Sequence, residues 1–119
     1  MSAASVTAAQ LFEQAKAIPE GIRQEAVRVA TAAYVAARKQ QLHDWGITLA
    51  AAREAFEAVK GEPNHPEHNK LRDAVRALEI QPSSKPLRDQ LDVDIRAADR
   101  QYHEALTRLR VEHGLKPVF

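Results

Sequence analysis

The longest uncharged apolar stretch of the chain is Val29–Ala37, which contains five alanines among nine residues. Alanine is the best helix former, and its small side chain lets a neighbouring helix approach closely. The pattern predicts a central helix, Pro19–Trp45, that is buried by two partner helices. Its first apolar stripe is Ile22, Ala26, Val29, Ala33 and Ala36, and its second is Val27, Ala30, Tyr34, Ala37 and Trp45. We expect Ala33 and Ala36 to be fully buried.

Helix-breaking residues divide the rest of the chain, because all four glycines and all six prolines fall at predicted boundaries. Thr7 and Gln10 have the spacing of a capping box, which predicts the start of a first helix. Gly46 is a suitable residue to end the central helix, and Thr48 is a suitable cap for the next one. The predicted helices are Ala8–Ala17, Pro19–Trp45, Leu49–Lys60, Pro66–Ile80 and Pro86–His113.

The last predicted helix carries a seam with nearly heptad spacing, and its remaining surface has charges of both signs. The seam consists of Leu87, Leu91, Ile95, Ala98, Tyr102, Ala105 and Leu109. The fold class that follows is all-α. We predict a single domain, 1–119, of about five helices, in which two long helices frame a shorter helical hairpin.

Composition narrows the class of protein further. Apolar residues make up 45% of the 119 positions but aromatics only 5%, which favours helices over sheets. The absence of cysteine excludes disulfides and thiolate metal sites. The net charge of +1 gives no general attraction to nucleic acid or anionic surfaces. Without a secretory signal or an apolar stretch of membrane-spanning length, we expect a cytoplasmic protein with no membrane partner.

Candidate chemistry is sparse. The chain has no phosphate-binding glycine loop and no serine nucleophile elbow, so we expect no enzyme, no catalytic residue and no cofactor. His65, Glu67 and His68 lie close enough in sequence to hold zinc, which makes a metal-dependent enzyme a third alternative. We favour the simpler interpretation that His65 caps a helix and His68 faces solvent, since no fourth ligand is evident.

A DNA-binding regulator is the second alternative. The segment Gln41–Lys60 resembles a helix-turn-helix in outline, with Gly46–Thr48 as the turn between its two helices. The second of these helices carries Arg53 and Lys60 but also two acidic residues, which work against phosphate contacts.

The favoured function is a small non-enzymatic helical protein that binds another protein as an adaptor or inhibitor. The last predicted helix has apolar residues off its seam, and the chain ends on an apolar pair. The candidate interface residues are Val93, Tyr102, Leu106, Val111, Val118 and Phe119. We expect a homodimer through this helix. In the competing account, the C-terminal residues fold back over Leu106 and Val111 and leave a monomer.

Overall fold

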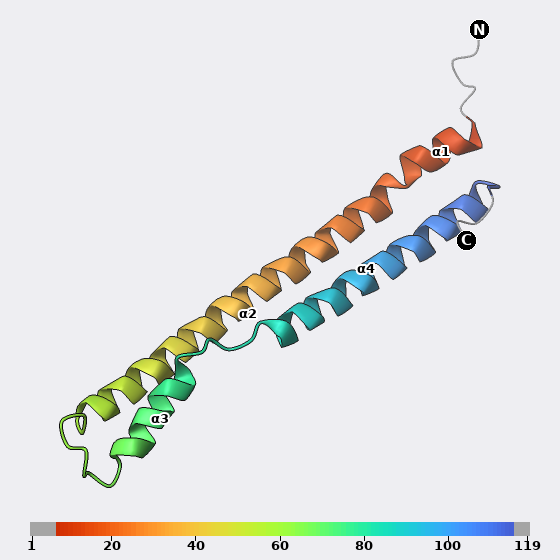
Figure 1. Ribbon diagram of the computed structural model, residues 1–119. Coiled ribbons are helices and arrows are strands. Elements are labelled where there is room, and N and C mark those ends of the chain that lie inside the picture. Colours follow the sequence, from red (N-terminus) through yellow and green to blue (C-terminus); the bar gives the residue numbers. More distant parts are fainter. Residues whose placement is uncertain (1–6, 116–119) are drawn as a thin grey trace. The chain divides into compact units, whose positions relative to one another are not determined.

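The computed structural model describes residues 7–115, and every regular element in that range is an α-helix. The helices are α1 (Ala8–Ala15), α2 (Ala17–Glu57), α3 (His68–Leu78) and α4 (Lys85–Glu112), as labelled in Figure 1. The all-α prediction is therefore confirmed. Within the same range, no helix combines the length and the apolar character needed to cross a membrane.

The start of α1 follows directly from its sequence. The Gln10 N–H donates to Thr7 Oγ1 at 3.1 Å, and the Thr7 N–H donates to Gln10 Oε1 at 2.7 Å. These two bonds satisfy backbone donors that would otherwise lack a helical partner, which is the function of a capping box. The predicted capping box is thus confirmed.

The end of α4 was also predictable. Gly114 adopts a φ of +71°, a left-handed conformation in which glycine is favoured because it has no Cβ. The Leu115 N–H donates to the Arg110 carbonyl at 2.7 Å, and the Gly114 N–H donates to the Val111 carbonyl at 3.0 Å. These are the two hydrogen bonds of a Schellman motif, so α4 ends one residue from the predicted position.

The prediction of five helices with a separate hairpin is wrong, because α2 continues through Gly46 as one helix of 41 residues. A glycine inside a helix costs only about 1 kcal/mol relative to alanine. Trp45 and Leu49 on either side of it are held by tertiary contacts, which outweigh that cost. The predicted helix Leu49–Lys60 is therefore the continuation of α2.

The contacts of the chain fall into two units, and α2 contributes to both. The α2–α4 unit comprises residues 1–34 and 88–119, and the α2–α3 unit comprises residues 35–87. The single domain expected from the sequence remains a prediction.

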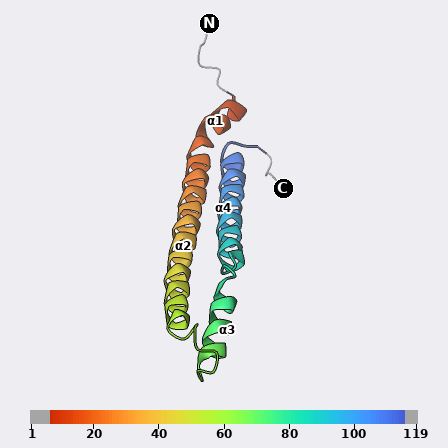
Figure 2. The same cartoon turned by 60° about the vertical axis from the view of Figure 1, so that its left-hand side comes forward.

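In the α2–α4 unit, the first part of α2 and α4 run antiparallel, as Figure 2 shows. Arg23 Nε donates to Asp99 Oδ1 at 2.6 Å, which fixes the register of the two helices. Ala30 and Ala98 are buried. On α1, Phe12 is buried too, and the Arg110 guanidinium lies 5.2 Å from the centre of its ring.

In the α2–α3 unit, side chains of α2 hold the C-terminal end of α3 and the linker after it. Trp45 Nε1 donates to the Leu78 carbonyl at 2.7 Å. Arg38 Nη1 donates to the Pro82 carbonyl at 2.6 Å. At the other end of α3, the rings of Phe56 and His68 meet edge to face. The buried apolar residues of this unit are Leu49, Val59 and Val75.

Candidate protein-binding groove

One apolar stripe of α2 is exposed in the α2–α4 unit. The exposed fractions are 72% for Ile18, 61% for Ile22 and 53% for Val29. Helical periodicity places these residues on one face, together with Ala33 and Ala36, which are also exposed. The expectation that Ala33 and Ala36 are buried is therefore wrong. α4 covers the second stripe, through Ala30, and the separate helix expected to cover the first stripe does not exist.

This stripe forms one wall of a long open groove whose other wall is α4. Small residues of α4, among them Ala97, Ala98 and Ala105, give the groove its floor and depth. Ile22 borders both halves of the groove, which makes the hollow continuous along α2. A shallow apolar channel between two helices has the shape of a site for a third helix, whose ridge of side chains fits between them.

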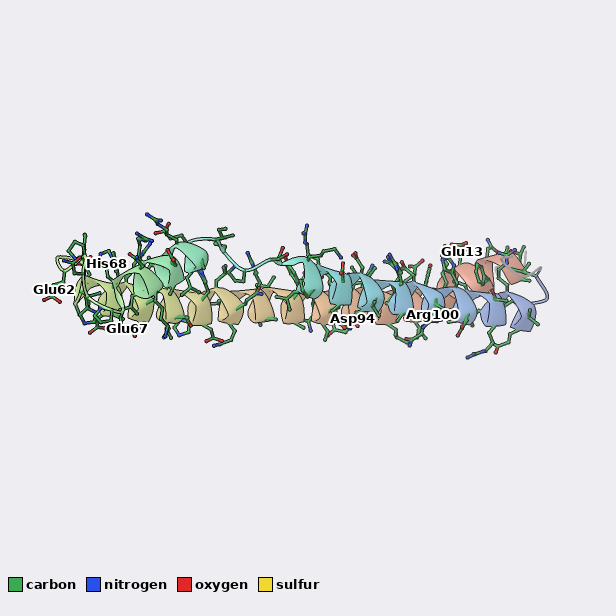
Figure 3. All side chains as sticks on the ribbon, turned by 60° about the horizontal axis from the view of Figure 1, so that its bottom comes forward. Glu13, Glu62, Glu67, His68, Asp94 and Arg100 are labelled. Carbon is green, nitrogen blue, oxygen red and sulfur yellow. The ribbon has the colours of Figure 1, made fainter. Side chains whose placement is uncertain are left out.

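The two halves of the groove differ in charge. Of the described residues that line the half around Val29, the charged ones are Glu25 and Asp94. The half around Ile18 is bordered by Arg108 and Glu112. Asp94, labelled in Figure 3, accepts a hydrogen bond from Gln90 Nε2 at 3.0 Å. One half is therefore acidic, and the other contributes a cation.

Glu25 already has a cationic neighbour on α2. Arg28 Nε donates to Glu25 Oε2 at 2.9 Å, and this hydrogen bond lowers the pKa of the Glu25 carboxyl. The carboxylate thus stays ionised at neutral pH, and its charge is partly compensated from outside the groove. Asp94 is the acid that faces the half of the groove around Val29 from α4.

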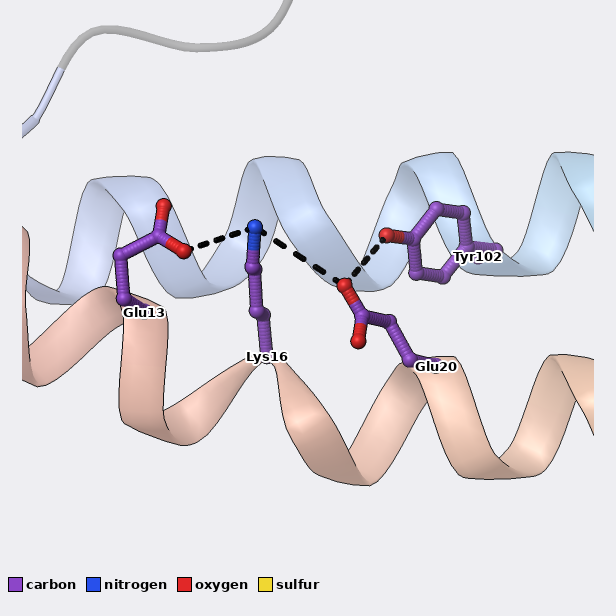
Figure 4. Close-up of polar contacts among 4 residues, drawn as sticks. All are labelled: Glu13, Lys16, Glu20 and Tyr102. Carbon is purple, nitrogen blue, oxygen red and sulfur yellow. Dashed lines mark hydrogen bonds and ion pairs between the residues drawn. The ribbon is translucent and has the colours of Figure 1, made fainter.

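A chain of polar contacts links α1, α2 and α4 within the same unit (Figure 4). Lys16 Nζ lies 2.8 Å from Glu13 Oε2 and 3.8 Å from Glu20 Oε1. The Tyr102 hydroxyl donates to Glu20 Oε1 at 3.4 Å. Burial raises the pKa of Tyr102, and the neighbouring Glu20 charge adds to the effect. Tyr102, a candidate interface residue from sequence, therefore makes contacts within its own unit.

The other candidate interface residues divide into three groups. Val93 and Val111 are exposed on α4. Leu106 is half-buried. Val118 and Phe119 lie outside the described residues.

Neither alternative site gains support from the described residues. His65 Nδ1 accepts the Glu67 N–H at 3.0 Å, but α3 begins at His68 and its N-cap position is Glu67, so the interpretation of His65 as the helix cap is wrong. Glu62, Glu67 and His68 are labelled at this end of the unit in Figure 3, yet residues 7–115 contain no group of three metal-ligating side chains. The turn that the helix-turn-helix required at Gly46 does not exist, since α2 continues through it.

Sequence reasoning identified the stripe of α2 that lines the groove but assigned it to the core. The signal that it missed was the excess of stripes over partners. Two stripes on α2 needed two covering helices, and only α4 covers this part of α2 in the described residues. Ile18 and Ala97 also line the groove, although neither was assigned to a stripe or to the seam from the sequence.

Comparison with protein-family models, curated proteins and solved structures finds no match for this chain. The class of protein is therefore defined by its fold and its groove alone. It is an all-α protein with an antiparallel helix pair that presents an open apolar channel.

Proposed function

We propose that this is a non-enzymatic protein that binds a helix of another protein molecule in the groove between α2 and α4. The observation that carries the proposal is the exposure of Ile18, Ile22 and Val29 on one face of a well-formed helix. Contiguous exposed apolar surface with a charged rim marks interaction sites in proteins.

The chemistry of the groove limits what it can hold. Its apolar walls and small floor residues suit an amphipathic helix, whose apolar side chains would enter between α2 and α4. The acids Glu25 and Asp94 disfavour a nucleic-acid phosphate backbone in the same place. They favour a helix that carries a cation at the matching position.

Photo-crosslinking from the groove tests this function. The chain has no cysteine, so V29C provides a single attachment point for a photoreactive maleimide. The matched control is V35C, also on α2, because Val35 is 57% exposed, against 53% for Val29, but does not line the groove. We expect V29C to crosslink to protein in an extract of the source cells, and the crosslinked peptide to come from an amphipathic helix.

Two outcomes would contradict the proposal. One is equal crosslinking from V29C and V35C, which would mean that the groove has no preferred occupant. The other is a crosslinked product that contains nucleic acid or lipid in place of a peptide.

A further inference from the structure

We infer that the helix that enters the groove is α4 of a second copy of this chain, antiparallel to the first α4 and centred on Gln101. This inference rests on the proposed function, since it names the occupant of the same groove. It is carried by the spacing of charged and small residues along α4.

The groove side of α4 is self-complementary about Gln101. Asp94 and Arg108 each lie seven residues from Gln101, on opposite sides of it, and Ala97 and Ala105 each lie four residues from it. A two-fold axis at Gln101 therefore places Asp94 of each copy opposite Arg108 of the other, which gives two equivalent pairs. It places Ala97 opposite Ala105, so the two helices can approach closely at those levels. All five residues line the groove.

The same axis supplies apolar partners for the exposed stripe of α2. Because Glu20 meets Tyr102 and Arg23 meets Asp99, continuing this antiparallel register brings Val29 level with Val93 of its own copy. The two-fold axis places position 109 of the second copy opposite position 93 of the first, so Val29 also comes level with Leu109 of the second copy.

The second copy therefore presents Leu109 at the level of Val29. By the same register, Ile18 comes level with Ala97 and Ala98 of the second copy. Ile18 and Val29 thus come level with small or apolar residues of the second α4, and Ile22 comes level with Tyr102 of the second copy. The contact would bury surface that is exposed in the single chain.

Charge-reversal pairing tests the register. D94R and R108D each place like charges at both contact levels, so we expect each variant alone to raise the dimer dissociation constant at least about tenfold. Mixed together, they should form a heterodimer, because Arg at position 94 of one copy meets Asp at position 108 of the other, and the native pair survives at the second level. The mass measured by light scattering after size exclusion should be twice 13.2 kDa for the wild type and for the mixture.

The matched controls are D92R and R96D, which make the same charge changes at exposed positions on the opposite face of α4. Both should dimerise like the wild type. A circular-dichroism spectrum unchanged from the wild type shows that each variant is folded.

Each result decides the question. A wild-type mass of 13.2 kDa at tens of micromolar overturns the dimer, and so does a mixture of D94R and R108D that stays monomeric. If the dimer fails while V29C still crosslinks to a helix of another protein, the proposed function stands and only its occupant is wrong. If V29C crosslinks no better than V35C, the function itself fails.

Discussion

Helix α2 contributes its first part to one unit and its second part to the other, and the two parts are covered in different ways. In the α2–α3 unit, the buried residues are branched aliphatics, Leu49, Val59 and Val75. In the α2–α4 unit, two of the three buried apolar residues are the alanines Ala30 and Ala98. The contact between α2 and α4 thus buries small side chains, and the largest buried side chain of that unit, Phe12, belongs to α1. Large apolar side chains are exposed in both units, among them Ile47 and Ile80 in the α2–α3 unit.

The difference also extends to hydrogen bonds. In the α2–α3 unit, side chains of α2 donate to backbone carbonyls at the C-terminal end of α3 and in the linker after it, as Trp45 does at Leu78 and Arg38 at Pro82. In the α2–α4 unit, half-buried side chains on both helices make the polar contacts, Arg23 with Asp99 and Glu20 with Tyr102. A buried hydrophobic core stabilises more than a half-exposed ion pair does. The two units therefore differ in what joins their helices, which is buried aliphatic side chains in the α2–α3 unit and small residues with an ion pair in the α2–α4 unit. In the α2–α4 unit, the exposed stripe of α2 also lines a groove.

The largest expected effect comes from truncating the core of the α2–α3 unit. L49A should lower the free energy of unfolding by about 2–5 kcal/mol, because Leu49 is only 6% exposed and its loss leaves a cavity. The control I47A lies two residues away on the same helix, but Ile47 is 58% exposed. Its effect should stay below about 0.5 kcal/mol in denaturant unfolding. Equal losses in the two variants would show that this half of α2 is covered differently.

A smaller effect is expected from the indole hydrogen bond. W45F keeps an aromatic ring but removes the donor to the Leu78 carbonyl, which should cost about 0.5–1.5 kcal/mol. Amide hydrogen exchange should quicken in α3. Exchange in the part of α4 that belongs to the other unit should change less, since that unit does not depend on this bond. Uniform acceleration across both units would argue against treating them separately.

The continuity of α2 can be tested by one methyl group. A Cβ at Gly46 would meet nothing within 4 Å among the described residues, so G46A should stabilise the protein by about 0.4–1 kcal/mol. G114A is the control, because Gly114 has a φ of +71° that alanine adopts only with strain. It should destabilise. If G46A destabilised as well, Gly46 would end a helix, as the sequence had predicted.

The two glycine variants concern helix ends, of which the sequence predicted one correctly and one wrongly. Residues with a local physical role were predictable: Thr7 caps a helix through its own neighbours, and Gly114 ends one by its conformation. The role of Gly46 was not predictable, because the local sequence does not distinguish a glycine inside a helix from a glycine that ends one. The outcome depends on whether tertiary contacts keep the residues on both sides of the glycine helical. Trp45 and Leu49 provide those contacts, and their partners are distant in sequence.

The groove was only partly predictable for a similar reason. The period of 3.6 residues identifies the stripe that contains Ile22 and Val29, but it does not say whether a helix covers that stripe. That depends on how many other helices the chain forms, and joining two predicted helices into one removed a covering element. The positions of Asp94 and Arg108, seven residues on either side of Gln101, can be read from the printed sequence, but the sequence does not say that both line one groove.

The smallest expected effect is that of the ion pair that joins α2 to α4. Arg23 Nε and Asp99 Oδ1 lie 2.6 Å apart, but both side chains are about two-fifths exposed, at 39% and 41%. Water and salt screen such a pair, so a double-mutant cycle of R23A and D99A should give a coupling energy of about 0.2–1 kcal/mol. The coupling should shrink further at 1 M salt. A coupling well above this range would mean that the pair contributes more than such exposure allows, and the contrast between the two units would weaken. A coupling energy within this range would mean that the ion pair stabilises the unit only slightly. Covering the exposed apolar stripe of α2 would then stabilise the unit more than the ion pair does, and a partner helix in the groove would provide that cover.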